Sequence, residues 1–322
     1  MKRLSISIAM CTYNGARFVQ EQLDSVAWQT WMPDEMVVGD DRSRDETLSI
    51  LQRFSQTAPF PVYLYQNGTR LGSSKNFEEA IKRCRGDVIV LADQDDVWKP
   101  QKLERLATAL QENPEVAYVF SDANVVNEGG VSLRYALWEA ERQRRRAIHR
   151  WSKDNQLAIL LKRHIVTGAT MAFQAFLKSL ILPIPAGWIQ DQWIALLGSL
   201  VSFGLPVPEC LILYRKHASQ QLGIGRRAFL EQCGKFSPTP GDYLQELEKY
   251  RNLKNRFLLA AIPCPPEKLN LLEQKIAHLS RRAMSRSSRG FSKGRMVALE
   301  ALTGRYQRFS NSWLSIARDL CS

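Results

Sequence analysis

The stretch Gly86-Asp87-Val88-Ile89-Val90-Leu91-Ala92-Asp93-Gln94-Asp95-Asp96-Val97-Trp98 joins a run of five apolar residues to a cluster of three carboxylates. A short apolar run bounded by polar residues is typical of a buried β-strand, so Val88–Ala92 is expected to be a strand that ends at Asp93. In open sheets of parallel strands, ligands bind at the carboxyl ends of the strands. The stretch therefore predicts a central strand and a binding site directly after it.

The sequence on both sides of this stretch alternates between strand and helix patterns. Further strands are predicted at Leu4–Met10, Met36–Val38, Val62–Tyr65 and Val116–Phe120. Helices are predicted between them, at Ala16–Gln29, Thr47–Ser55, Lys75–Arg83 and Lys99–Glu112. Strands that alternate with helices indicate a mostly parallel sheet with helices on both faces. The fold class expected for the chain is therefore α/β.

The pattern changes towards the end of the chain. A strand at Ile165–Phe173, a helix at Trp188–Leu200 and a strand at Val207–Tyr214 continue the α/β pattern. Past Gly225, apolar residues recur at helical intervals. We therefore expect a domain at residues 1–222, divided near residue 125 into parts of about 1–125 and 126–222, and a basic helical region at residues 223–322.

The 322 residues carry a net charge of +12, which favours anionic partners such as nucleic acid, anionic lipid or phosphorylated substrates. No recognisable nucleic-acid-binding module accompanies the charge, so we expect no nucleic-acid partner, and a non-catalytic protein that binds an anionic polymer is an alternative reading. The C-terminal cations are expected to contact anionic lipid rather than form only a solvated surface. They are Arg281, Arg282, Arg286, Arg289, Lys293 and Arg295.

The six cysteines are scattered along the chain, and no two form a CxxC pair, so no zinc or redox site is predicted. They are interpreted as reduced thiols of a cytoplasmic protein. The apolar run at the N-terminus is broken by Ser5 and Ser7, which favours a buried strand over a signal peptide. No stretch reaches the ~18 apolar residues that a membrane-spanning helix needs.

The carboxylates of Asp93, Asp95 and Asp96 repel one another, and a divalent cation relieves that repulsion. Hard oxygen ligands suit Mg²⁺ or Mn²⁺. Capping of the following helix is the structural alternative and accounts for one of the three aspartates, Asp96. His217 follows the Val207–Tyr214 strand and is a candidate third ligand, with an exposed turn histidine as the alternative.

Other polar segments follow predicted strands. Thr12-Tyr13-Asn14 and Asp40-Asp41 lie at strand ends, where a carboxylate accepts hydrogen bonds from a base or ribose; a polar turn is the alternative. The Gly-rich segment Asn67–Asn76 enters a helix, where backbone amides suit phosphate, and Lys75 adds a positive charge.

Asp191 lies between Trp188 and Trp193. Desolvation by the aromatic rings would raise the pKa of this carboxyl towards values useful to a general base, and sugars stack on tryptophan faces. A helix cap flanked by core aromatics is an equally good reading of this segment.

Taken together, these segments resemble bacterial family 2 inverting glycosyltransferases of the GT-A fold, and most of all the subgroup of rhamnosyltransferases and related polysaccharide or lipopolysaccharide enzymes. The match runs in order over roughly the first 220 residues, and the ordered set is highly specific. Its carriers are Cys11–Gly15, Gln22–Val26 with Gln29-Thr30, Asp40–Thr47, Asn67–Asn76, Leu91–Trp98, Thr167-Gly168, Asp191 with Trp193, and Tyr214–His217.

The resemblance implies a role for each matched residue. Asp191 would be the general base that deprotonates the acceptor hydroxyl. Asp93 and Asp95 would form a DxD motif that holds Mg²⁺ or Mn²⁺ together with His217. The nucleotide-sugar donor would contact Thr12, Tyr13, Asn14, Asp40, Asp41, Lys75, Asp93 and Gln94. The acceptor would contact Gly168, Trp188, Gln190 and Trp193.

The implied activity is metal-dependent, inverting transfer of one sugar from a nucleotide-diphosphate donor to a saccharide or lipid-linked acceptor. The expected setting is cell-surface polysaccharide or lipopolysaccharide synthesis, with dTDP-rhamnose among the candidate donors. The part at about 1–125 would bind the nucleotide sugar, and the part at 126–222 the acceptor. The expected location is cytoplasmic, with peripheral contact at the inner face of the bacterial plasma membrane. The Gln-x-x-Arg-Trp element of processive synthases is absent, which implies single-sugar transfer.

The sequence departs from the family pattern at three points, because Arg42 replaces a usual Gly, Ser74-Lys75-Asn76 replaces Ala-Arg-Asn, and Gln190 replaces an acidic residue. A nucleotidyltransferase acting on sugar phosphates is the nearest alternative enzyme. Its Gly-rich motif belongs after the first strand, where this chain has Cys11–Asn14. A phosphatase of the haloacid dehalogenase type needs its aspartates after the first strand, whereas here they follow the fourth.

Overall fold

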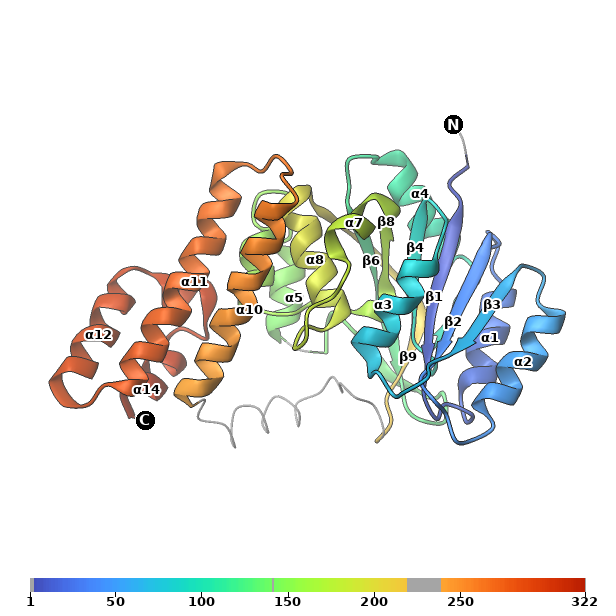
Figure 1. Ribbon diagram of the computed structural model, residues 1–322, viewed down its shortest axis with the longest axis horizontal. Coiled ribbons are helices and arrows are strands. Elements are labelled where there is room, and N and C mark those ends of the chain that lie inside the picture. The colour runs from blue at the N-terminus through green and yellow to red at the C-terminus, as the bar shows by residue number, and fades with distance from the viewer. Residues whose placement is uncertain (1–2, 141, 219–238, 322) are drawn as a thin grey trace. The chain divides into compact units, whose positions relative to one another are not determined.

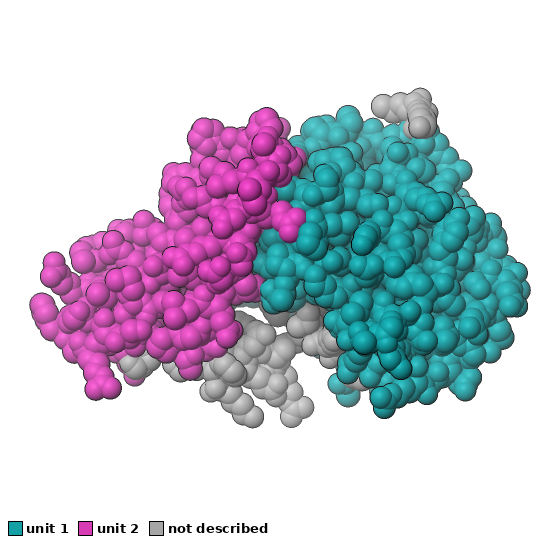
Figure 2. Space-filling model, in the orientation of Figure 1, with its two compact units in different colours: residues 1–150, 166–198, 202–224 teal, residues 151–165, 199–201, 225–322 magenta. Residues whose placement is uncertain are grey.

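The computed structural model describes residues 3–140, 142–218 and 239–321. The chain divides into two compact units, coloured separately in Figure 2. Unit 1 contains residues 1–150, 166–198 and 202–224, and unit 2 contains residues 151–165, 199–201 and 225–322. Residues 151–165 thus belong with the C-terminal helices, while the boundary expected at residue 222 lies outside the described residues.

Unit 1 is built around one β-sheet (Figure 1). Its strand order is β3-β2-β1-β4-β8-β6-β9-β5, and β7 pairs with β6. The strands are β1 (Ile6–Thr12), β2 (Glu35–Asp40), β3 (Val62–Gln66), β4 (Val88–Ala92), β5 (Val97–Trp98), β6 (Tyr118–Val126), β7 (Ser132–Ala136), β8 (Met171–Gln174) and β9 (Gly204–Arg215).

The strands β1 to β4 are parallel to one another, whereas the sheet beyond β4 is mixed. There β8 is antiparallel to β4 and β6, β9 is parallel to β6, and β5 is antiparallel to β9. The α/β class is confirmed. In the register of the sheet, Thr12 lies beside Asp40, and Met10 beside Ala92. The carboxyl ends of β1, β2 and β4 therefore meet at one edge.

Helices accompany this sheet along the chain. The helices that lie in unit 1 or begin there are α1 (Val19–Ala27), α2 (Thr47–Thr57), α3 (Ser73–Arg83), α4 (Lys102–Glu112), α5 (Arg142–His149), α7 (Lys178–Ile181) and α8 (Gln190–Val201). On α3, the buried residues Phe77, Ala80 and Ile81 recur at helical spacing, and the helix packs on β1 and β2. All residues of β1, β2 and β4 are buried, as expected for strands covered on both faces.

Unit 2 is helical in its described part. It contains α6 (Gln156–Lys162), α10 (Pro240–Leu259), α11 (Pro266–Ser287), α12 (Gly290–Leu302), α13 (Arg305–Phe309) and α14 (Trp313–Cys321). The long helix α10 begins at a capping box, in which Thr239 and Asp242 exchange side-chain and backbone hydrogen bonds. Within the described residues, no helix combines the length and the apolar character that a membrane span requires.

The interior of unit 2 contains charged groups. Asp319 accepts hydrogen bonds from Arg282 Nε at 2.6 Å, Tyr306 Oη at 2.7 Å and Arg286 Nε at 3.1 Å. Burial raises the pKa of Asp319, but the hydrogen bonds and charge of Arg282, followed by the other donors, bring it below its ordinary value. The expectation that Arg282, Arg286 and Lys293 face lipid is therefore wrong, because all three side chains are buried.

Candidate active site

The site lies at the sheet edge where β1, β2 and β4 end. The acidic segment Asp93–Asp96 follows β4 and precedes the short strand β5. Because Thr12 pairs with Asp40 in the sheet, the segments after β1 and β2 reach the same edge. The sheet register therefore brings these polar segments together, as predicted.

Asp95 is paired with the histidine that follows β9. Asp95 Oδ2 and His217 Nε2 are 2.7 Å apart, and both side chains are largely buried. The imidazole also packs on the ring of Phe18, with 4.9 Å between the ring centroids. His217 is therefore not an exposed turn histidine, and it reaches the acidic segment from the other half of the sheet.

Arg215, the last residue of β9, fixes the acidic segment in place. Its Nε donates to the carbonyl oxygen of Asp95 at 2.9 Å, and its backbone N–H donates to Asp96 Oδ1 at 3.1 Å. The side chain is itself buried and also pairs with Glu21. Arg215 belongs to the Tyr214–His217 segment that the sequence placed at the site, but its hydrogen bonds to the acidic segment are known only from the structure.

Asp93 stands where negative charge accumulates. Burial, then the charges of Asp95 and Asp191, raise the pKa of Asp93 to about 7, while Lys102 acts in the opposite direction. Three carboxylates from the end of β4 and the start of α8 thus influence one another electrostatically. A cation placed among them would stabilise their charged forms.

Asp96 does not cap the following helix, contrary to the prediction from the sequence. The helix α4 begins after Gln101 without a side-chain cap, so the expected capping by Asp96 is wrong. Asp96 is buried, and its Oδ2 has no hydrogen-bond partner within residues 3–140, 142–218 and 239–321. Burial, then the charges of Asp95 and Asp93, hold the pKa of this carboxyl well above its ordinary value.

Lys102 is a buried cation that sequence reasoning missed. Its Nζ donates to the carbonyl oxygen of Ala169 at 2.7 Å and lies 3.5 Å from the ring centroid of Trp98. Burial lowers the pKa of the ammonium, whereas the charges of Asp96 and Asp93 raise it. A lysine in the first turn of an amphipathic helix gives no signal in the sequence that it points inward.

Asp191 lies in the first turn of α8, held by two backbone amides. Gly168 N donates to Asp191 Oδ2 at 2.7 Å, and Gln192 N donates to Oδ1 at 2.7 Å. These two hydrogen bonds fix the orientation of the carboxylate. The turn at Gly168 also leaves little room, because a Cβ there would lie 3.3 Å from Asp191 Oδ2.

The other residues assigned to the acceptor have different surroundings. Trp188 and Trp193 are buried with their ring centroids 5.3 Å apart, and the Trp193 indole donates to the carbonyl oxygen of Ile181. Gln190 Oε1 accepts a hydrogen bond from Ser74 Oγ at 3.2 Å, which links the starts of α3 and α8. The tryptophans therefore form the hydrophobic support of the α8 start.

Asp40 and Asp41 organise the loops at the nucleotide side of the edge. Asp40 is fully buried and accepts hydrogen bonds from Thr12, Ser43 and Gln66. Asp41 holds the Gly-rich loop, because it accepts from the backbone N–H groups of residues 71 and 72 and from the side chain of Asn67. Both carboxylates shape the loops that follow β2 and β3.

Tyr13 and Gln94 connect the ends of β1 and β4. The Gln94 amide accepts from Tyr13 N at 2.8 Å and donates to Tyr13 O at 3.1 Å. The Arg70 guanidinium lies 4.0 Å from the Tyr13 ring centroid. Asn14 adopts a positive φ of 47° and accepts a hydrogen bond from Arg44 N. This part of the edge is thus held by backbone contacts rather than by the hydrophobic core.

Lys75 lies in the first turn of α3, where the Gly-rich loop enters the helix. Its ammonium pairs with Glu78 at 2.7 Å. Glu78 also accepts a hydrogen bond from Ile184 N at 2.7 Å. A phosphate at this helix start would therefore compete with Glu78 for the lysine.

The residues present fit a divalent cation of the hard type. The Asp95 carboxylate and the His217 imidazole lie 2.7 Å apart and offer one oxygen and one nitrogen donor of the kinds that Mg²⁺ or Mn²⁺ accepts. Within the described part of the chain, no three His, Cys, Asp or Glu side chains are grouped so that they could hold a metal ion, so the predicted ligands Asp93, Asp95 and His217 do not form one three-ligand cluster. The fit is thus to a cation that a substrate helps to bind.

Comparison with known proteins places this architecture in a family. The family model described as glycosyl transferase family 2 matches residues 7–181. An uncharacterized protein of Mycobacterium tuberculosis, Rv1520, is 26% identical over 239 residues, which are 73% of this chain but only 64% of that protein. The dTDP-rhamnosyl transferase RfbG of Shigella flexneri is 32% identical over 119 residues, or 36% of this chain and 38% of RfbG.

Solved structures show the same fold. The crystal structure of residues 1–349 of Staphylococcus aureus TarS, solved with UDP-GlcNAc, superposes with a TM-score of 0.60 at 17% identity, and covers 98% of this chain and 88% of that one. This likeness supports the architecture of the sheet and its helices. Together with the family match, it confirms the resemblance that the motifs predicted.

Proposed function

Because the chain belongs to glycosyl transferase family 2, we propose that it transfers one sugar from a nucleotide-diphosphate donor to a hydroxyl group of an acceptor, with inversion at the anomeric carbon. The observation that carries the proposal is the meeting of Asp93, Asp95 and Asp191 at one sheet edge. Burial is the main cause that raises the pKa of Asp93 to about 7, and the charges of Asp95 and Asp191 add to it, so these two carboxylates act on Asp93 within a single site.

The nucleotide is proposed to lie over the ends of β1 and β2. Thr12, Tyr13 and Asn14 follow β1, and Asp40 and Asp41 position the loops around them. The similarity to RfbG supports a deoxythymidine-diphosphate rhamnose donor, whereas TarS was solved with UDP-GlcNAc. Both are nucleotide-diphosphate sugars, and that shared chemistry defines the proposed donor class.

A divalent cation, Mg²⁺ or Mn²⁺, is proposed to be held by Asp95 and His217, with Asp93 beside them. When bound, such a cation offsets the negative charge that develops on the diphosphate leaving group. The chain contributes the positioning, because Arg215 holds the backbone of Asp95 and Phe18 supports the ring of His217. Gln94 stays engaged with Tyr13 and so keeps the acidic segment beside the nucleotide loop.

Asp191 is proposed as the general base. Its two hydrogen bonds from the backbone N–H groups of Gly168 and Gln192 fix the position of the carboxylate. The carboxylate removes the proton of the acceptor hydroxyl, and the oxygen attacks the anomeric carbon from the face opposite the diphosphate. The bond to the diphosphate breaks as the new glycosidic bond forms, and no covalent sugar–enzyme intermediate is needed.

The acceptor is proposed to be a saccharide or a lipid-linked saccharide of a cell-surface polysaccharide or lipopolysaccharide. It would enter beside Gly168 and Gln190, over the buried pair Trp188 and Trp193. The hydrogen-bonded side chains of Ser74 and Gln190 supply polar groups at the starts of α3 and α8, and a sugar acceptor needs such groups for hydrogen bonding.

The test is a transfer assay with Asp191→Asn. The asparagine keeps the shape and can still accept from Gly168, but it cannot take a proton. We expect kcat to fall by roughly 10²-fold or more, with donor affinity unchanged. Acceptor products are identified by mass spectrometry, and release of nucleoside diphosphate is measured in parallel.

The matched control is Asp154→Asn, an exposed aspartate in unit 2, which should transfer at the native rate. Transfer by the Asp191→Asn protein at a rate close to native would remove Asp191 as the base. Release of pyrophosphate from a nucleoside triphosphate and a sugar phosphate, without sugar transfer, would identify a nucleotidyltransferase instead.

A further inference from the structure

Two helices of unit 2 present apolar residues on their exposed side. On α12, five exposed residues follow helical spacing along one face, in addition to the exposed Gly290 and Ser292 at the start of the helix, and they are Phe291, Arg295, Ala298, Leu299 and Leu302. On α14 the exposed residues are also on one face, and they are Trp313, Leu314, Ala317, Leu320 and Cys321. Phe291 is 88% exposed, Leu302 84% and Trp313 75%. We name these ten residues the outer face.

The opposite sides of the same helices carry polar groups into the interior. Glu300 of α12 is buried and bonds to His278, with 2.8 Å between Oε1 and Nδ1. Asp319 of α14 is fully buried in its ion pairs with Arg282 and Arg286. Ordinary surface helices show the reverse arrangement, with apolar residues inward and charges outward.

The apolar residues of the outer face are therefore not explained by the packing of unit 2. The hydrophobic cluster between these helices is small and consists of Val297, Tyr306 and Ile316, with Ala301 against it. Leu299, Leu302 and Leu320 lie on the same helices but do not join that cluster, because their side chains are exposed. Large apolar side chains that are exposed along one face of a helix mark a surface that another apolar body covers.

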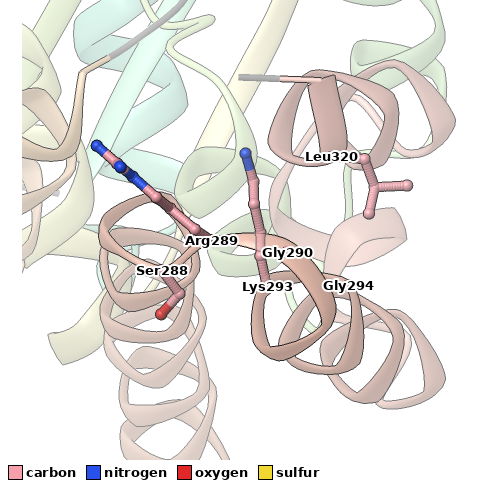
Figure 3. Close-up of a pocket in the computed structure, with 6 residues that line it drawn as sticks. All are labelled: Ser288, Arg289, Gly290, Lys293, Gly294 and Leu320. Carbon is pink, nitrogen blue, oxygen red and sulfur yellow. The ribbon is translucent and has the colours of Figure 1, made fainter.

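The exposed charges on and directly before α12 are positive. Arg289 and Arg295 are exposed, whereas the acidic residues of α12 and α14, Glu300 and Asp319, are buried. A depression of about 290 Å³ between the start of α12 and α14 is lined by Ser288, Arg289, Gly290, Lys293, Gly294 and Leu320. Figure 3 shows Arg289 and Lys293 extending from the start of α12, with the apolar side chain of Leu320 nearby.

We propose that the outer face lies in the interface of an anionic lipid bilayer. Exposed aromatic and leucine side chains enter the boundary between headgroups and acyl chains, and nearby arginines contact anionic headgroups. Tryptophan in particular favours this boundary because its ring is apolar and its N–H is polar. The proposal goes beyond the transfer reaction, because it does not depend on any residue of the candidate active site.

A second copy of the chain fits this surface less well. In a two-fold contact through the outer face, the same surface of each copy faces the other, so Arg295 of one copy would lie close to Arg295 of the second copy. The only acidic residues of α12 and α14 are buried within unit 2, so they cannot neutralise this repulsion. An anionic membrane supplies both the apolar layer and the opposite charge.

The test is co-sedimentation of the full chain with phosphatidylcholine vesicles that contain or lack phosphatidylglycerol. We expect binding to the anionic vesicles that weakens as salt is raised. The double substitution Phe291→Ser and Trp313→Ser should lower the vesicle partition coefficient roughly tenfold or more. The matched control is Trp28→Ser in unit 1, because Trp28 is 78% exposed and lies outside the outer face.

A second pair of substitutions, Arg289→Gln and Arg295→Gln, tests the charges separately. It should reduce binding to vesicles that contain phosphatidylglycerol and leave binding to vesicles without it unchanged. Thermal unfolding of each variant checks that the fold is kept. Native-like partition of both variants would overturn the proposal, as would equal pelleting of the native chain with and without vesicles. Self-association that the Phe291→Ser and Trp313→Ser protein loses, without vesicle binding by the native chain, would show a second copy as the occupant and overturn it too.

Discussion

The aspartates after β4 differ in what surrounds each of them. Asp95 meets His217, Asp96 is buried against the backbone of Arg215, and Asp93 is influenced by Asp191. The charge of the buried Lys102 ammonium opposes the rise in the pKa of Asp93 and of Asp96. Charge balance at this edge therefore depends on a residue from the helix that follows.

Lys102→Met should destabilise the protein by roughly 3 kcal/mol, because it removes a buried cation whose charge offsets those of Asp93 and Asp96. Chemical denaturation measures the loss. The double variant Lys102→Met with Asp96→Asn should be less destabilised than the sum of the two single variants, since the repelling charge is removed as well. Simple additivity of the two substitutions would show that Lys102 and Asp96 are not coupled.

At the scale of single residues, the sequence predicted the acidic cluster and the nature of its neighbours, but not their division of tasks. Asp95 and His217 were predicted to act together, and the structure places them in contact. Lys102 was hidden because a lysine in an amphipathic helix ordinarily faces solvent. The environment of Asp96 depends on β9, which lies more than a hundred residues away in sequence, so no local pattern indicates it.

Among the structural elements, β9 connects the site to the rest of the sheet. It begins at Gly204 beside the buried ring of Tyr118, and it ends at Arg215 against the acidic segment. A Cβ on Gly204 would lie 2.1 Å from Tyr118 Cζ. The absence of a side chain at the start of β9 thus allows the strand to lie against β6.

Gly204→Ala should therefore destabilise unit 1 by about 2 kcal/mol or more, because a fully buried tyrosine ring has nowhere to move. Gly68→Ala is the matched control, since a Cβ there would meet nothing within 4 Å. Thermal unfolding monitored by circular dichroism compares the two. Equal melting temperatures for both variants would contradict this account of the β6 and β9 packing.

At the scale of elements, the strands and helices of the first 125 residues follow their local patterns, because each is amphipathic or wholly apolar. The strand predicted at Ile165–Phe173 is instead a 3₁₀ turn at Gly168–Thr170 followed by β8 at Met171–Gln174. The turn presents Gly168 N to Asp191, a contact between distant segments. The two-residue strand β5 is too short to carry a periodic signal.

Across the whole molecule, basic residues have two different tasks that composition does not separate. In unit 2, Arg282 and Arg286 neutralise the buried Asp319, whereas Arg289 and Arg295 are exposed beside apolar residues. The sequence predicted a basic helical region, and the described helices agree with it. The packing of α11 against α12 and α14 determines which cations are exposed. The local sequence pattern does not show this tertiary packing.

We propose that the sheet edge formed by the carboxyl ends of β1, β2 and β4 binds a nucleotide-diphosphate sugar together with a divalent cation. Ligand-dependent thermal stabilisation tests it without knowledge of the acceptor. The full chain is heated with Mn²⁺ and each of a panel of nucleotide-diphosphate sugars, alongside the Asp95→Asn and Asp191→Asn proteins. We expect at least one donor to raise the melting temperature of the native and Asp191→Asn proteins only when Mn²⁺ is present, and to leave that of Asp95→Asn unchanged. Stabilisation of all three proteins alike, or of none by any donor, would contradict the claim.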